Sequence, residues 1–288
     1  MFSKKNFFIT ICLFCAFTIF ASGKKDSNFI QTNQNIQRIV SLSPAITEMI
    51  FILDAENLLV GRTDYCNWPE EALSIESVGG FDGKTISLEK ILTFQPDLVC
   101  LTAGMHDHLV PLLKKYGIEV FISSADSVNS IFEEIKKLGK IINHIEQSEK
   151  CVNEIINQIE NAKKLCKKND LSVFWEISSA PYFTCGKNSF ITDLLNQIGV
   201  KNIFGDINLS YLQVNEESII KQNPSIIIYP DYMKQKDSTY ITNRINWQEI
   251  DAVKNNRVYP VDSDLFSRCG PRIGTMALAL ANIIFENE

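Results

Sequence analysis

Side chains suited to catalysis are scarce in this chain, which has 288 residues and three histidines. Ser41 and Ser43 lie at the end of a predicted strand, but no base is identifiable for either hydroxyl. The sequence also lacks the G-x-S-x-G, H-E-x-x-H and phosphate-binding glycine motifs. A nucleophile, a base and an orienting group are therefore difficult to assemble, and we expect a protein that is not an enzyme.

Metal-binding chemistry is also weakly represented. His106 and His108 form a His-x-His pair that needs further ligands, and His144 is expected on a separate helix. We expect no metal site and interpret the pair as surface-loop residues. Beyond the N-terminal segment, the cysteines are Cys66, Cys100, Cys151, Cys166, Cys185 and Cys269, without a C-x-x-C pair. Free or buried thiols are expected, and Cys185–Cys269 is the first pair to test for a disulfide.

Charged and aromatic side chains instead favour a binding site. Asp264 and Arg268 lie in one predicted loop, where they can contact a ligand, form a loop-stabilising ion pair, or do both. Tyr65, Phe81 and Tyr211 lie in other loops. Because ligands of open α/β sheets bind beyond the carboxyl ends of the strands, we expect these loops to line the site.

The composition is that of a folded globular protein. Hydrophobic residues make up 45% and charged residues 22%, and the length is sufficient for two cores. The net charge is −6 and the pI about 5.3, without basic clusters. This acidic balance argues against nucleic-acid binding.

The N-terminus has the pattern of an export signal. Two lysines, an apolar run and three small residues predict a signal over residues 1–23, followed by a polar tether over 24–37. The apolar run, Phe7–Phe20, is too short for a comfortable membrane span. Lipid attachment at Cys12 or Cys15 stays open, although the bulky Phe14 disfavours it. We expect a periplasmic or other extracytoplasmic protein.

From Arg38 onward, short apolar runs alternate with helical periods, which predicts an α/β fold with mostly parallel sheets. The predicted strands are Arg38–Leu42, Leu58–Gly61, Asp97–Thr102, Ile118–Ile122, Ser172–Ile177, Ser225–Tyr229 and Arg257–Val261. A break at Asn143-His144 precedes an amphipathic helix over about Glu146–Lys168, roughly 35 Å long. We predict two lobes, 38–143 and 169–288, joined by a bridging helix within 144–168 whose stiffness allows only small lobe motions.

A weak internal repeat indicates that the lobes are related. The matching segments are Ser87–Leu92 with Asn215–Ile220, Pro96–Val99 with Pro224–Ile227 and, more loosely, Glu48–Gly61 with Asp193–Gly205. The first pair reads as capped helix starts. Glu89 and Glu217 take equivalent positions in the first helical turns, where a carboxylate stabilises the helix dipole by about 0.3–1 kcal/mol.

Several segments resemble a known family. Arg38–Glu48, Val60–Tyr65, Trp68-Pro69, Val78–Phe81 and Ser87–Val99 are similar to periplasmic binding proteins for cobalamin, iron-siderophores and haem. The segments Phe183–Ser189, Asn202–Phe204 and Asp262–Arg272 resemble the cobalamin-binding members most. The stretch Thr102–Gly104 departs from those members because it lacks a tryptophan.

The resemblance implies a monomeric binding protein that captures cobalamin or another corrinoid between two lobes and delivers it to the permease of an ABC importer, without a cofactor. The implied ligand-binding residues are Tyr65, Phe81, Tyr211, Asp264 and Arg268. The implied transporter-docking residues are Glu89 and Glu217, one per lobe, facing arginines of the permease. An iron-siderophore or haem carrier, and a metal-dependent enzyme on a similar bilobal fold, stay open as alternatives.

Overall fold

The computed structural model describes residues 35–80, 85–166, 170–231 and 238–285. The predicted export signal, nearly all of the tether, and Phe81 lie outside the described residues. Among the described residues, no helix combines the length and apolar character that crossing a membrane requires.

The N-terminal half contains a parallel four-stranded sheet. Its strands are β1 (Ile39–Ser41), β2 (Leu59–Arg62), β3 (Leu98–Thr102) and β4 (Glu119–Ser123), in the order β2-β1-β3-β4. Its helices are α1 (Pro44–Ile52), α2 (Leu88–Thr93), α3 (Val110–Lys115) and α4 (Val128–Ile141). Most strand residues are buried, as expected for a parallel sheet covered on both faces.

The C-terminal half contains a second parallel sheet and a small antiparallel one. The parallel sheet has the order β11-β10-β5-β8, with β5 (Ser172–Trp175), β8 (Lys201–Asn202), β10 (Ile226–Asp231) and β11 (Val258–Asp262). The antiparallel sheet consists of β6 (Ser178–Ser179), β7 (Tyr182–Cys185) and β9 (Tyr211–Gln213). The helices are α6 (Phe190–Gln197), α7 (Glu216–Gln222), α8 (Thr239–Thr242), α9 (Asp251–Lys254), α10 (Ser263–Ser267) and α11 (Ile273–Phe285).

The two parallel sheets have the same topology, as the internal repeat predicts. In each, counting along the chain, the second strand pairs with the first, the first with the third and the third with the fourth. The repeated helix starts are also equivalent. Ser87 Oγ accepts from the Lys90 amide at the start of α2, and Asn215 Oδ1 accepts from the Ser218 amide at the start of α7.

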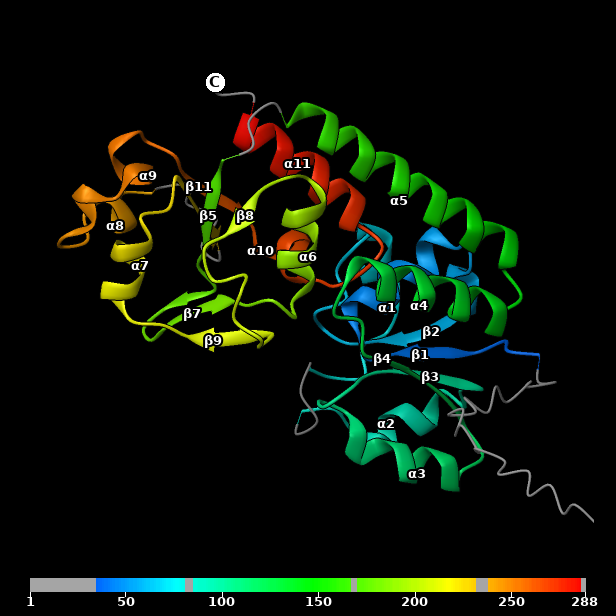
Figure 1. The fold of residues 1–288 in the computed structure, drawn as a ribbon. Helices are drawn as coiled ribbons and strands as arrows, with labels where there is room; N and C mark the ends of the chain where they lie inside the picture. The colour runs from blue at the N-terminus through cyan, green and yellow to red at the C-terminus, as the bar shows by residue number, and fades with distance from the viewer. Residues whose placement is uncertain (1–34, 81–84, 167–169, 232–237, 286–288) are drawn as a thin grey trace, which may run out of the picture. The chain divides into compact units, whose positions relative to one another are not determined.

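Helix α5 (Ile145–Leu165) is the predicted bridging helix (Figure 1). Asn143, with φ of 61°, occupies the break between α4 and α5, and α5 packs against α4 and α11. At about 1.5 Å per residue its 21 residues span roughly 32 Å. The exact boundaries of the two lobes stay a prediction.

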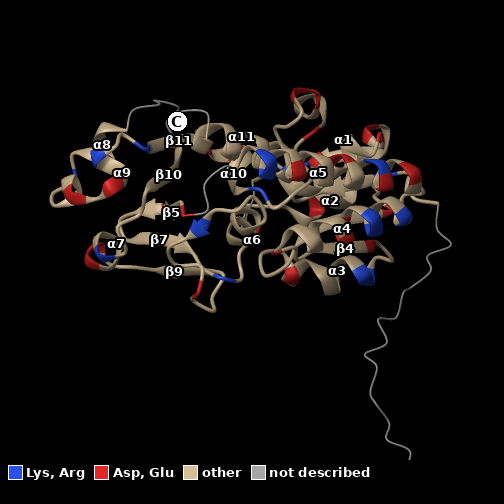
Figure 2. Cartoon of the chain, turned by 45° about the horizontal axis from the view of Figure 1, so that its top comes forward, with Lys and Arg blue, Asp and Glu red and all other residues tan. Residues whose placement is uncertain are grey.

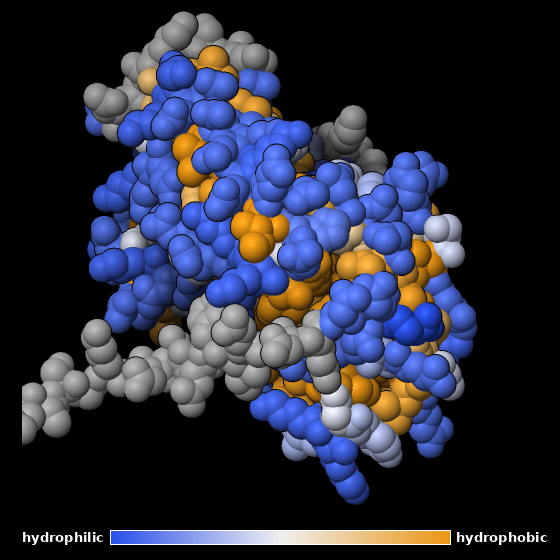
Figure 3. Space-filling view, turned by 90° about the vertical axis from the view of Figure 1, so that its right-hand side faces the viewer, coloured by the Kyte–Doolittle hydropathy of each residue, from blue (hydrophilic) through white to orange (hydrophobic). Residues whose placement is uncertain are grey.

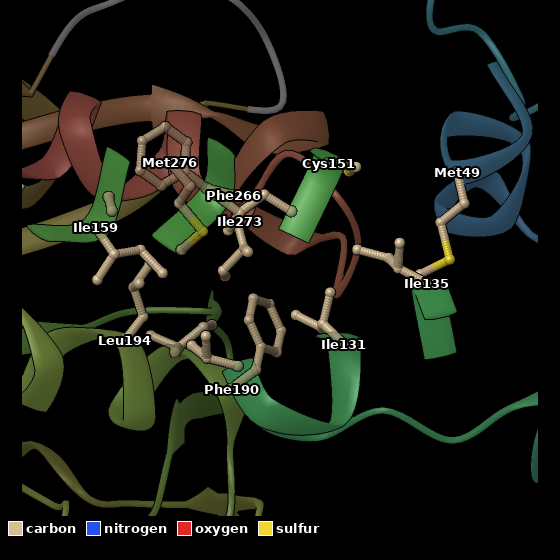
Figure 4. Close-up of a cluster of buried hydrophobic side chains, with 14 of the residues drawn as sticks. Met49, Ile131, Ile135, Cys151, Ile159, Phe190, Leu194, Phe266, Ile273 and Met276 are labelled. Atoms are coloured by element: carbon tan, nitrogen blue, oxygen red, sulfur yellow. The ribbon is translucent and has the colours of Figure 1, made fainter. Parts of the chain in front are cut away.

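One hydrophobic core runs through both halves. Its buried members include residues of α1 and α4 and residues of α6, α10 and α11. Figure 4 shows several of these side chains meeting around α5, among them Ile131, Leu194 and Met276. On the face shown in Figure 3, polar residues predominate and apolar residues form small patches among them, which is ordinary for a protein surface.

Candidate ligand-binding site

A cavity of about 540 Å³ lies at the carboxyl ends of the N-terminal sheet. Its walls are Ser43, Pro44, Ala45, Tyr65, Thr102, Ala103, Ser123, Ser124, Ala125, Asp264, Ser267, Arg268 and Cys269. The lining from the N-terminal half therefore follows β1, β2, β3 and β4. The opposite wall comes from α10 and the residues after it, so the cavity lies between the two halves.

A second cavity, of about 330 Å³, lies at the carboxyl ends of the C-terminal sheet. It is lined by Trp175, Ile177, Ser178, Phe183, Phe190, Ile191, Tyr211, Pro230, Phe266 and Ser267. Ser267 lines both cavities, so they adjoin along α10. We refer to the two together as the cleft. One side of it is rich in serine and threonine hydroxyls, and the other is largely aromatic.

The two predicted tyrosines lie on different sides of the cleft. Tyr65 follows β2 and is 60% exposed, whereas Tyr211 lies in β9 opposite Cys185 and is 49% exposed. Burial raises the pKa of the Tyr211 phenol to about 12, with smaller contributions from Cys269, Cys185 and Asp126. The Tyr211 side chain is therefore a neutral hydrogen-bonding group at physiological pH.

Asp264 and Arg268 form the ion pair considered from the sequence, and their contact with a ligand stays a prediction. They line the first cavity, and Arg268 Nη2 lies 3.1 Å from Asp264 Oδ1. The helix that carries Asp264 is capped by Asp262, whose Oδ1 accepts from the Leu265 amide at 2.7 Å. Asp264 Oδ2 also accepts from Asn67 Nδ2 at 2.9 Å.

Two further charged residues next to the cleft, Glu48 and Arg272, were not identified from the sequence. Arg268 Nη1 donates to Glu48 Oε1 at 2.7 Å, and Arg272 donates to both oxygens of Glu48. The Glu48 side chain is 1% exposed. The signal was present, since Glu48 is the charged residue of an otherwise uncharged and mainly apolar helix, PAITEMIFI. Its partners could not be identified because they lie more than two hundred positions along the chain.

The interpretation of both loop histidines as surface residues is wrong for His106, which is fully buried. Its Nδ1 accepts from the Thr102 amide at 3.1 Å, so the imidazole fixes the turn after β3. His108 is exposed, and His144 Nδ1 lies 2.7 Å from the Leu53 carbonyl oxygen. Within the described part of the chain, no group of three or more His, Cys, Asp or Glu residues could hold a metal ion.

The described cysteines are free thiols, including Cys185 and Cys269, so the candidate disulfide is not formed in the structure. Burial raises the pKa of Cys185 to about 11 and the pKa of Cys269 even further above its ordinary value. Both thiols are therefore neutral at physiological pH and poor nucleophiles.

Glu89 and Glu217 occupy matching places on the surface. Each is the second residue of its helix, α2 or α7, and each is exposed. Acidic residues mark both helices in Figure 2, where α2 and α7 belong to different halves of the protein. The placement agrees with the repeat, and the docking role stays a prediction.

Comparison with known proteins assigns the family. The family described as periplasmic binding protein matches residues 39–265. The substrate-binding lipoprotein YvrC of a Bacillus subtilis ABC transporter, itself uncharacterised, is 32% identical over 87% of this chain and 81% of its own length. The vitamin B12-binding protein of Salmonella paratyphi A is 30% identical, covering 86% of this chain and 90% of that protein.

A solved structure agrees with the fold along most of the chain. The crystal structure of a possible iron-binding (periplasmic solute-binding) protein from Staphylococcus epidermidis has a TM-score of 0.77 and 28% identity. The match covers 88% of this chain and all of that protein (100%). The expectations of a binding protein rather than an enzyme, and of a place outside the cytoplasm, are confirmed by this membership. The chain belongs to the periplasmic binding proteins, the substrate-binding proteins of ABC transporters.

Proposed function

We propose that this protein captures cobalamin or a related corrinoid in the cleft and delivers it to the permease of an ABC importer. The observation that carries the proposal is the division of the cleft into a hydroxyl-rich cavity and an aromatic one that adjoin at Ser267. A macrocycle with apolar faces and an amide periphery needs aromatic walls and a few hydrogen-bonding groups. The relatives named for vitamin B12 binding support the same ligand class.

The charge of the cleft favours a ligand with little net charge. Among the described residues that line it, Asp264 and Arg268 are the charged ones, and they pair with each other. A ferric siderophore or a haem carries anionic groups, for which an exposed cluster of arginine and lysine would be expected. This balance supports the corrinoid over those ligands.

An iron-containing ligand is the second candidate. Tyrosine can ligate haem iron, and Tyr65 and Tyr211 both line the cleft. The ligating form is the phenolate, however, and the raised pKa of Tyr211 opposes its formation. The similarity to a possible iron-binding protein is the observation that keeps this candidate.

The test is retention of a coloured ligand. Purified protein is mixed with cyanocobalamin, haemin or a ferric siderophore, passed over a desalting column, and its visible spectrum is recorded. We expect the cyanocobalamin spectrum to be retained at a ratio near one. Retention of haem or siderophore in its place would overturn the corrinoid proposal in favour of the iron-containing candidate.

Substitutions of cleft residues test whether the retained ligand is bound in the cleft. Tyr65→Ala and Tyr211→Ala should each weaken cyanocobalamin binding about tenfold, which corresponds to about 1.4 kcal/mol of lost aromatic contact. Tyr116→Ala is the matched control, since Tyr116 is 60% exposed, like Tyr65, but lines neither cavity. If the control weakened binding as much as Tyr65→Ala, the ligand would lie elsewhere.

We further propose that Glu89 and Glu217 dock the protein on arginines of the permease. The double variant Glu89→Gln/Glu217→Gln should lose stimulation of ATP hydrolysis by a corrinoid importer in proteoliposomes, with ligand affinity unchanged. Glu133→Gln/Glu160→Gln is the control, because these exposed glutamates lie on α4 and α5. Loss of ligand affinity in the first pair would contradict a docking role.

A further inference from the structure

We infer that Glu48, which lines neither cavity, is a positioning residue of the ligand site that holds Arg268 and the Tyr65 loop in register across the two halves. The inference deepens the proposed function and rests on it, since it assumes that ligand binds against Arg268 and Tyr65. It concerns a cluster of charged and polar side chains, buried at its centre, that we call the clasp: Glu48, Asn67, Asp264, Arg268 and Arg272.

The centre of the clasp is one buried carboxylate shared by two guanidinium groups. Glu48 Oε1 accepts from Arg268 Nη1 at 2.7 Å and from Arg272 Nη2 at 2.6 Å, and Oε2 accepts from Arg272 Nε at 2.9 Å. The Arg268 and Arg272 side chains are 9% and 14% exposed. Glu48 belongs to α1 of the N-terminal half, whereas both arginines belong to the C-terminal half. The carboxylate therefore ties the halves together behind the cleft wall.

The clasp reaches the cleft through the other side of Arg268. Its Nη2 donates to the Tyr65 carbonyl oxygen at 3.1 Å and to Asn67 Oδ1 at 2.7 Å. Asn67 in turn donates to Asp264 at 2.9 Å. Arg268 thus links the backbone of Tyr65, a predicted ligand contact, to α10, the helix that forms the opposite wall of the cleft. With Glu48 on its other nitrogen, the guanidinium has little freedom to turn.

Charge explains why Glu48 is needed in this position. The clasp contains two arginines and two carboxylates, and Asp264 is 49% exposed, so Glu48 is the buried counter-charge. An uncharged residue in its place leaves two guanidinium groups facing each other with one partly solvated carboxylate. Arg272 can remain on the ring of Trp68, which lies 4.6 Å away. We expect Arg268 to be the arginine that moves, and to take the Tyr65 loop with it.

A second buried pair offers a matched control for ordinary loss of stability. Arg244 donates two hydrogen bonds to Glu176, at 2.5 and 2.8 Å, and their side chains are 11% and 3% exposed. Both residues belong to the C-terminal half, and neither lines the cleft. Glu176→Gln therefore removes a comparable buried charge without touching the contact between the halves.

The experiment is a double-mutant cycle on cyanocobalamin affinity. We expect Glu48→Gln to raise the Kd about tenfold, Arg268→Gln to raise it by a similar factor, and the double variant to be no weaker than Arg268→Gln alone. Glu176→Gln should lower the melting temperature while changing the Kd less than twofold. The positioning role would be overturned if the double variant raised the Kd by the product of the two single factors. It would also be overturned if Glu48→Gln and Glu176→Gln changed the Kd equally.

A ligand-free measurement separates this inference from the proposed function. Hydrogen–deuterium exchange of the unliganded protein should rise in residues 65–68 and 264–268 for Glu48→Gln and stay unchanged there for Glu176→Gln. If the wild-type protein retained none of the coloured ligands, the corrinoid proposal would fail while this exchange pattern still decided the role of Glu48. Unchanged exchange in both segments would refute the clasp whatever the ligand.

Discussion

The hydrophobic core shared by the two halves predicts that they lose stability together. Leu194 of α6 is fully buried, and in Figure 4 its side chain lies in the cluster formed with residues of α4, α5 and α11. The substitution Leu194→Ala removes buried carbon atoms from the C-terminal half at the point where that half meets the helices of the other. Because the core is continuous, we expect both halves to be destabilised together.

The expected loss is about 3 kcal/mol, within the range of about 2–5 kcal/mol for a leucine at a fully buried site. For a cooperative unit of roughly this size, each kcal/mol lowers Tm by about 2–4 °C, so the shift should be about 6–12 °C. Leu112→Ala is the control, since Leu112 is 41% exposed. Its effect should stay within about 0.5 kcal/mol.

The assay follows urea unfolding with one reporter in each half. A Trp175→Phe/Trp247→Phe background leaves Trp68 as the fluorophore of the N-terminal half, and Trp68→Phe leaves the two tryptophans of the C-terminal half. We expect coincident transitions that both shift to lower urea with Leu194→Ala. Separate transitions, with a shift confined to the C-terminal reporters, would refute the reasoning from a shared core.

Three other changes test local features of the structure. Asn202→Ala removes hydrogen bonds that the buried amide donates, including one to the Cys185 carbonyl oxygen at 2.8 Å, and should cost about 3 kcal/mol in urea unfolding. A Cβ at Gly139 would lie 2.5 Å from Ser148 Cβ, so Gly139→Ala should push α4 away from α5 and lower Tm. Adding Ser148→Gly to this variant should restore part of the lost Tm. The raised pKa of Tyr211, about 12 against an ordinary value of 10, gives stability that is fully present below pH 10 and lost as the pH rises towards 12. Tyr211→Phe should therefore lessen the alkaline fall in Tm, and an unchanged fall would contradict the shift.

The sequence predicted the parallel sheets well because their signals are local. Each predicted parallel strand is present within a residue or two, and the bridging helix occupies Ile145–Leu165 where about Glu146–Lys168 was predicted. The missed strands are short and depend on distant partners. Tyr211 in β9 pairs with Cys185 in β7, and the two-residue strand β8 pairs with β5. Runs of two to four residues carry too little periodicity to be distinguished from loops.

Site residues were predictable where a strand end placed them and unpredictable where a tertiary contact did. Tyr65 follows β2, so the rule on the carboxyl ends of parallel strands places it at the cleft. Tyr211 instead begins the antiparallel strand β9, and its place depends on the pairing of β9 with β7. No such rule predicts the place of Glu48. A carboxylate inside an apolar helix signals a buried partner, but the identity of Arg272 depends on how the halves pack. His106 was misassigned for the same reason, since its backbone partner lies in a turn that only the fold creates.

The repeat gives a physical reason to expect only small lobe motions when a ligand binds. Glu48 on α1 and Asp193 on α6 begin the loosely matched repeat segments, and each sends its carboxylate across to the other half. Asp193 Oδ2 accepts from the Val128 amide at the start of α4, at 2.8 Å, while Glu48 binds Arg268 and Arg272 before α11. Two such ties and a continuous core make wide opening costly, because separation would expose a buried charge and apolar surface together. We therefore expect the affinity to depend on a cleft that is already formed, with a correspondingly small ordering cost of binding.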